Sequence, residues 1–155
     1  MNDVIERKAE DLQELSPETL QKMQEFQQWG LSLPKEKQVN PQIEHSLHGG
    51  MYARTVRIPA GTIGVGAIVR VPTQVILHGH CLFNAGDKLV EFKGFHVLQG
   101  IPGRKQMIYT FEDTQITAVH RTDAKTVEEA EAEATEEVAL LSTRREKDEL
   151  LDHGH

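Results

Sequence analysis

The sequence predicts a mainly β protein, an all-β barrel or sandwich with a helical segment at each end, and three features of its pattern predict this. Short runs rich in β-branched and aromatic residues alternate with polar ones, and Gly, Pro or Asp bounds each run. Many short strands spaced in this way are typical of sandwiches and barrels. Apolar residues recur at helical intervals before residue 30 and again after Thr122. The 155 residues suffice for one such domain.

Two short helices are expected within the first 30 residues, because apolar residues recur there at near-helical intervals. Ser16 can cap the second helix, Pro17 suits its first position, and Gly30 with Pro34 ends it. Residues 31–44 are expected to form a connector, so that residues 1–44 are a helical arm. The apolar residues are Ile5, Leu12, Leu15, Leu20, Met23, Phe26 and Trp29.

The barrel is expected over residues 45–122. Within it, the sequence at 84–87 is typical of a hairpin turn, and the sequence at 100–103 of a tight corner. The strands are expected at 51–58, 66–71, 74–83, 88–99, 106–111 and 115–121.

A long acidic helix is expected to fill most of residues 123–155. Thr126 and Glu129 can form a capping box at its start, and the apolar stripe continues to about Leu151. Such a narrow stripe has to pack on something. We therefore expect the helices to serve assembly, as a homodimer or a higher oligomer.

Charge and composition exclude several classes of protein. Residues 1–44 carry a net charge of −4, residues 45–122 carry +4, and residues 123–155 carry −7. An acidic chain is a poor match for direct nucleic-acid binding, and no apolar run is long enough to span a membrane. The single cysteine, Cys81, excludes an internal disulfide, and the first residues do not form a signal peptide. We expect a cytoplasmic protein.

His78 and His80 are the candidate metal ligands, because residues two apart on a strand point to the same face. A divalent metal would need a further ligand from another strand, and the favoured alternative is a pair of solvated imidazoles at the barrel rim. His45 and His48 are expected in a loop before the first strand, where they too could bind a metal. Candidate further ligands are Glu91, His96, Glu112 and His120.

The basic centre of the chain also suggests a site for a small anion such as a nucleotide or a sugar phosphate. Guanidinium and ammonium groups match phosphate and carboxylate, and a tyrosine can stack on a ring. The alternative is that these residues lie at the rim or at a dimer interface. The candidates are Tyr52, Arg54, Arg70, Arg104, Lys105 and Tyr109.

Nucleophilic catalysis is poorly supported, because Cys81 lies inside an apolar run and resembles a core residue.

The turns at Ile58-Pro59-Ala60-Gly61-Thr62 and Ile101-Pro102-Gly103, with Ile76-Leu77-His78-Gly79 between them, resemble the pattern of the cupin superfamily. Where cupins carry their metal-binding histidines, this chain has Gly66, Ile68 and Gln106. The resemblance therefore implies a double-stranded β-helix, or jelly roll, from which the usual metal ligands are missing. No cofactor is expected.

The stretch from His48 to about Glu131 further resembles short phage-encoded and prophage-encoded cupin-like proteins, through His48-Gly49-Gly50-Met51-Tyr52-Ala53-Arg54, Pro102-Gly103-Arg104-Lys105 and His120-Arg121-Thr122. This resemblance implies a non-enzymatic accessory protein that binds a partner or a small anion, in the host cytoplasm or in the virion. The alternatives are a metal-dependent oxygenase or isomerase that uses His78 and His80, and a structural virion protein. Fold alone does not choose among them.

Overall fold

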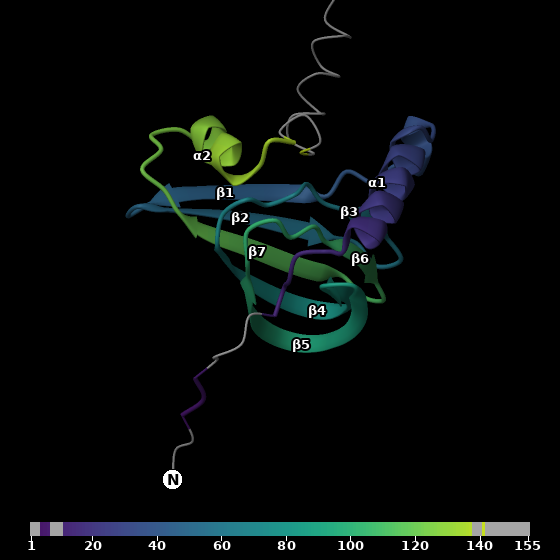
Figure 1. The fold of residues 1–155 in the computed structure, drawn as a ribbon, viewed down its shortest axis with the longest axis horizontal. Coiled ribbons are helices and arrows are strands. Elements are labelled where there is room, and N and C mark those ends of the chain that lie inside the picture. Colours follow the sequence, from purple (N-terminus) through teal and green to yellow (C-terminus); the bar gives the residue numbers. More distant parts are fainter. Residues whose placement is uncertain (1–3, 7–10, 138–140, 142–155) are drawn as a thin grey trace, which may run out of the picture.

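The computed structural model describes residues 4–6, 11–137 and 141. The expectation of a mainly β fold with helix at both ends is confirmed (Figure 1). In chain order the elements are α1 (Pro17–Leu31), the 3-10 turn η1 (Lys35–Lys37), β1 (Gln42–His48), β2 (Met51–Ile58), β3 (Ile63–Val65), β4 (Thr73–Ala85), β5 (Lys88–Gly100), β6 (Met107–Thr110), β7 (Thr114–Arg121) and α2 (Val127–Ala134).

The described strands form a seven-stranded antiparallel sheet in the order β1-β2-β7-β4-β6-β3, and β5 pairs with β4 outside this path. The two halves of β4 have different neighbours: residues 74–78 pair with β7, and residues 81–83 pair with β6. The long β4–β5 hairpin bends round beneath the flatter β1–β2–β7 region and makes a curled half-barrel (Figure 1).

The hairpin formed by β1 and β2 was not predicted, because residues 42–44 were assigned to the connector and His45 and His48 to a loop. Ile43, His45 and Leu47 alternate with more exposed residues along β1, which is the signal of a half-buried strand. Gly49 and Gly50 form the tight turn, with φ of 63° and 76°, a conformation that favours glycine. The barrel therefore begins at Gln42 rather than at residue 45.

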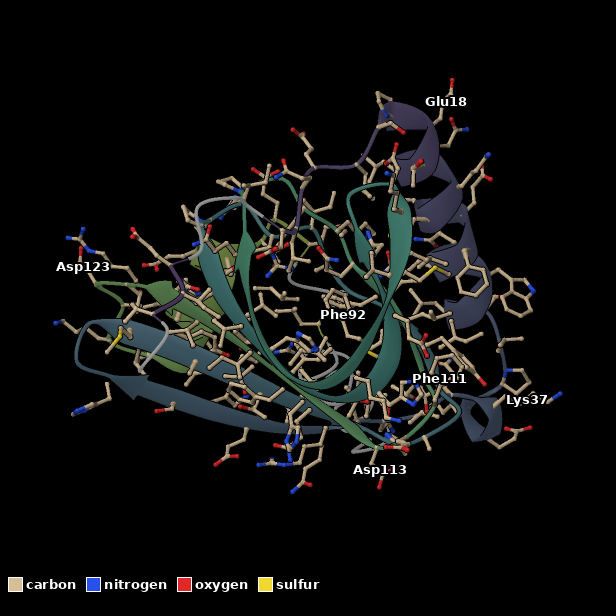
Figure 2. All side chains as sticks on the ribbon, turned by 90° about the horizontal axis from the view of Figure 1, so that it is seen from below. Glu18, Lys37, Phe92, Phe111, Asp113 and Asp123 are labelled. Atoms are coloured by element: carbon tan, nitrogen blue, oxygen red, sulfur yellow. The ribbon has the colours of Figure 1, made fainter. Side chains whose placement is uncertain are left out.

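The segment just before α1 is extended, so the prediction of a first helix is wrong for residues 11–15. The backbone N–H of Leu12 donates to the carbonyl of Gln99, and the N–H of Ile101 donates to the carbonyl of Leu12. Leu12 is fully buried in a cluster with residues of β4, β5 and β6. Its apolar side chain thus fills the β4–β5 end of the barrel, where Phe92 also points inward (Figure 2).

Helix α1 begins as expected, with the Ser16 hydroxyl accepting from the backbone N–H of Thr19 and Pro17 in the first turn. Helix α2 also begins as expected at the Thr126 cap, but it ends at Ala134, because Thr135 is extended. The expected continuation of this helix to Leu151 is therefore wrong at residues 135–137. Beyond residue 137 the expected helix lies outside the described residues, apart from Leu141.

In the described part of the chain, no helix combines the length and apolar character needed to cross a membrane.

Candidate functional site

A cavity of about 590 Å³ lies on the inner face of the sheet, between β2, β7 and β4 on one side and the two helices with their flanking loops on the other. This volume falls within the range of small-molecule sites, roughly 300–1,000 Å³. Leu12 and Phe92 fill the other end of the half-barrel, so the hollow part belongs to the β2–β7 side. The sheet residues that line it are Tyr52, Arg54, Val56, Ile58, Thr73, Val75, Phe83, Ile108, Ile116, Ala118 and His120.

Strand register orders these inward-facing residues from polar to apolar. Neighbouring strands of an antiparallel sheet place paired residues on the same face, and alternate residues along β2 line the cavity. The side of the cavity nearest Tyr52 is therefore polar and the side nearest Ile58 is apolar. From the first to the second, the pairs between β2 and β7 are Tyr52 with His120, Arg54 with Ala118, and Val56 with Ile116.

The rings of Tyr52 and His120 line the polar end of the cavity, and the ring of His45 contacts Tyr52. The Tyr52 hydroxyl lies 2.6 Å from His45 Nδ1, and the Tyr52 and His120 ring centroids are 5.4 Å apart. Tyr52 is only 2% exposed, so it is part of the barrel wall rather than a mobile stacking platform. His45, expected in a loop, acts here as the hydrogen-bond partner of that tyrosine.

His120 is buried and electrically neutral at pH 7. Burial lowers the pKa of its imidazole, and the carboxylate of Glu133 opposes this shift only in part. Its Nε2 lies 3.8 Å from Glu133 Oε2, too far for a hydrogen bond, and has no hydrogen-bond partner among the described residues. A buried imidazole nitrogen of this kind can bind a polar ligand atom.

Arg104 brings a buried positive charge to the cavity. Its Nε donates to the Thr73 hydroxyl at 3.1 Å, and the residue is 5% exposed. Burial lowers the pKa of the guanidinium to about 10, which leaves it charged at neutral pH. Gly100 makes room for it, because a Cβ there would stand 2.5 Å from Arg104 Nε.

Arg54 and Glu131 are two further charged residues that line the cavity and are not exposed. Arg54 is half-buried on β2, and Glu131, from α2, is buried almost completely. With Arg104 charged and His120 neutral, these walls carry two positive charges and one negative charge. Lys37 also lies along the cavity, but it is exposed at the rim. Among the described residues, the charged ones that line the cavity and are not exposed therefore have a net charge of +1, which suits an anion.

Arg70 does not line this cavity. Its guanidinium donates to the carbonyls of Ala132 and Glu133, and it pairs with the Glu136 carboxylate at 3.0 Å. These are carbonyls at the end of α2, where a positive charge is favourable. Arg70 is therefore a helix-capping residue. The direction of its side chain depends on α2, which lies some 60 residues later in the chain.

Lys105 and Tyr109 also lie away from the cavity. The ammonium of Lys105 is fully buried and donates to Glu137 Oε1 at 3.1 Å, while burial lowers its pKa. Tyr109 is exposed on the outer face of β6, where its ring packs against Phe111. Of the six residues expected to bind an anion, the structure places Tyr52, Arg54 and Arg104 around one hollow.

His78 and His80 do share one face of β4, but it is the outer face, since Val75, Leu77 and Cys81 point inward. His80 Nε2 lies 2.8 Å from Glu91 Oε1, and the His78 ring packs against Phe95. Within the described residues, no group of three or more His, Cys, Asp or Glu side chains could hold a metal ion. His120 lines the cavity instead, while His96 Nε2–H donates to the carbonyl of Lys93 at 2.9 Å.

The positions that the cupin resemblance assigns to metal ligands hold structural contacts. Gln106 donates to Asn84 through its side-chain nitrogen, and the N–H of Gly66 donates to the Gln106 carbonyl at 2.9 Å. Gln106 Oε1 is buried with no hydrogen-bond partner among the described residues. The N–H of Ile68 donates to Glu137 Oε1 at 2.6 Å. A carboxamide at 106 adds one more polar atom beside the cavity.

Cys81 is buried in the core cluster, as its apolar neighbours predict. Burial raises the pKa of its thiol to about 11, so the thiolate needed for nucleophilic attack is scarce at neutral pH.

Glu131 and Thr73 are two polar cavity residues that the sequence did not single out. Glu131 is one of many glutamates in its segment, and helical period alone does not say which of them turns inward. Thr73 lies on the same face of β4 as Val75 and Leu77, so strand parity with the buried apolar residues could have identified it.

No protein-family model matches this sequence, and a search of curated proteins finds no match. Among solved structures, the chain is similar to the cupin domain of Cnp3 from Schizosaccharomyces pombe, at 21% identity and a TM-score of 0.45, over 55% of this chain and 65% of that one. It is also similar to KdgF from a Halomonas species, at 12% identity and a TM-score of 0.46, over 56% of this chain and 84% of that one.

A third similar structure is a cupin 2 conserved barrel domain protein from Salinispora arenicola, at 16% identity and a TM-score of 0.43, over 63% of this chain and 91% of that one. At these identities and TM-scores the likeness says nothing of activity or ligand.

Proposed function

We propose that this protein binds a small organic anion in the cavity, with Arg54 and Arg104 as the counter-charges, and that it does so without catalysing a reaction. The supporting observation is the pair of guanidinium groups that the fold turns into one hollow of about 590 Å³, against a single carboxylate, Glu131. Excess positive charge away from bulk water attracts an anion more strongly than the same charge at the surface.

The cost of building this site supports a binding role. Burying a guanidinium removes its hydration, and Arg104 is 5% exposed with one side-chain hydrogen bond, to Thr73. Buried charges without a role in packing are unusual in protein interiors. An anion that accepts hydrogen bonds from Arg54 or Arg104 would contribute about 1.5–3 kcal/mol per charged hydrogen bond.

The test compares Arg54→Ala with Arg57→Ala, a control on the same strand. Arg57 is three residues away and pairs on the outside with Glu44 at 2.9 Å. Native mass spectrometry of each purified protein, followed by calorimetric titration of candidate anions, measures what is bound and how tightly. We expect Arg54→Ala to weaken anion binding about 10- to 150-fold and Arg57→Ala to leave it unchanged. Equal binding by both variants would refute the proposal.

A role in assembly is the second candidate, because the outer face of the β4–β5–β6 region carries exposed apolar residues. Exposed apolar clusters of this kind often mark contacts between proteins. A homodimer through this face would bury Phe95, which is 65% exposed, and the measurement is the molar mass in solution for the wild type and Phe95→Ser. An unchanged mass would count against this surface. The apolar residues are Leu89, Phe95, Val97, Tyr109 and Phe111.

The resemblance to phage-encoded cupin-like proteins would place either function in an infected cell. A small-anion site would suit an accessory protein of the host cytoplasm that sequesters a metabolite, and the apolar outer face would suit a component of the virion. The metal-dependent alternative has less support, since His78 and His80 lie outside the barrel and the described residues supply no group of three ligands there.

A further inference from the structure

The chemistry of the cavity specifies the class of anion more narrowly than its charge alone. From the fold we infer that the ligand is a single carboxylate on an apolar body, such as a medium-chain fatty acid, with its head at Arg54 and Arg104 and its tail toward Ile58 and Phe83. This inference rests on the proposed function and specifies its ligand.

The number of charges argues against nucleotides and sugar phosphates. Such ligands carry about two or more negative charges and are usually held by several cations. Arg70 and Lys105, two of the basic residues expected at the site, are paired with Glu136 and Glu137 outside the cavity. The walls keep two guanidiniums and the Glu131 carboxylate, so one added negative charge neutralises them.

The arrangement of polar and apolar residues argues for a head and a tail. The pairs Tyr52–His120 and Arg54–Ala118 stand at one end of the β2–β7 register, and Val56–Ile116 continues toward the other. Three further lining side chains, of Ile58, Phe83 and Ile108, carry no hydrogen-bonding groups. A sugar or a base in this part would leave its polar groups without partners, which is costly. An alkyl chain would instead gain from burial.

Two buried polar atoms are available to the head group. His120 and Gln106 both line the cavity, and their atoms Nε2 and Oε1 are buried and lack hydrogen-bond partners among the described residues. The neutral imidazole can donate its proton to a carboxylate oxygen if Nε2 carries it. Gln106 Oε1, an acceptor, can hold a water or the hydroxyl of a hydroxylated acid. His120 Nε2 therefore matches a carboxylate oxygen, whereas Gln106 Oε1 matches a water or a hydroxyl beside that head group.

The experiment is a calorimetric titration of the full-length protein with a ligand series of constant head group: hexanoate, octanoate and decanoate. Each buried methylene contributes about 0.8 kcal/mol, so the dissociation constant should fall about fourfold per methylene until the cavity is full. Decanol tests the head group and 1-naphthoate tests an aromatic body, so the series separates aliphatic from aromatic carboxylates. AMP and glucose 6-phosphate test the hydrophilic phosphates.

Decanoate should bind at least tenfold more tightly than decanol, and Arg54→Ala should abolish this difference while Arg57→Ala keeps it. The decanoate and decanol comparison needs only the wild type, so it stands even if Arg54→Ala fails to fold. A flat chain-length series, or equal binding of decanol, would overturn the inference. Tight binding of AMP without decanoate would overturn it too and leave the proposed function standing. Binding of no anion at all would overturn both.

Discussion

The buried pair of Lys105 and Glu137 gives the sharpest prediction for stability. Lys105 is fully buried, the Glu137 side chain is 24% exposed, and their charged atoms are 3.1 Å apart. Removing one partner of a buried pair costs about 3–5 kcal/mol, because the other charge stays desolvated. Water reaches Glu137 in part, so we expect Glu137→Ala to cost about 3 kcal/mol. That corresponds to a fall in Tm of about 6–12 °C for a chain of this size.

Glu136→Ala is the matched control, since Glu136 also pairs with a basic residue, Arg70, but is 84% exposed. A surface ion pair is worth about 0–1 kcal/mol. The assay is urea unfolding at pH 7 for both variants and for Glu137→Ala/Lys105→Met. The second change removes the stranded charge and should recover part of the loss. If Glu137→Ala costs no more than Glu136→Ala, the buried pair does not hold the segment after α2 to the barrel.

Three further predictions follow from buried groups. Gly100→Ala should lower the free energy of unfolding by about 1–3 kcal/mol, because the added methyl group overpacks against Arg104. The control, Gly30→Ala, adds a methyl group in open space within α1 and should be neutral or stabilising. Equal unfolding midpoints for the two variants would contradict this prediction. Burial lowers the pKa of His120, so the unfolded chain takes up a proton more readily than the folded one. The free energy of unfolding should therefore fall as the pH drops below about 6.5. Urea unfolding at pH 7.5 and pH 5 measures this fall, and His120→Gln should make it smaller. Cys81, with its thiol pKa raised to about 11, should react with a disulfide reagent only as fast as the protein opens; rapid labelling of the native protein would contradict its burial.

The sheet was largely predictable because period-two alternation marks half-buried strands regardless of their neighbours. The hairpin at 84–87 appears as the β4–β5 turn, with Ala85 paired to Lys88. Leu12 shows where the pattern fails. Its apolar spacing with Leu15 fits a helix, but backbone hydrogen bonds to Gln99 and Ile101 from the end of β5 hold it extended. Long-range pairing overrides local propensity there.

Site residues could be predicted only where the alternation of a strand shows which residues share a face. Tyr52 and Arg54 share the cavity face of β2, as residues two apart on a strand should. The same alternation places His78 and His80 on one face of a strand. It does not predict which face points inward, because a one-residue change of register exchanges the two faces. Loop residues have no parity at all. Arg70 caps α2 and Arg104 enters the barrel, and that difference arises from contacts far apart in the sequence.

The residues on the inner face of the sheet explain how a barrel without the usual metal ligands can hold a polar site. In this chain the inner face of the sheet has kept its polar residues on β2 and β7, at Tyr52, Arg54 and His120, while positions 66 and 106 serve the backbone. α2 then closes that end with Glu131 and is itself fixed by Arg70. Charge balance in the cavity therefore depends on the helix being in place. Loosening α2 at Arg70 withdraws the Glu131 carboxylate and raises the net positive charge of the cavity. Arg70→Ala should therefore increase the preference for decanoate over decanol in the same titration, even though Arg70 does not line the cavity, and an unchanged or smaller preference would contradict this coupling.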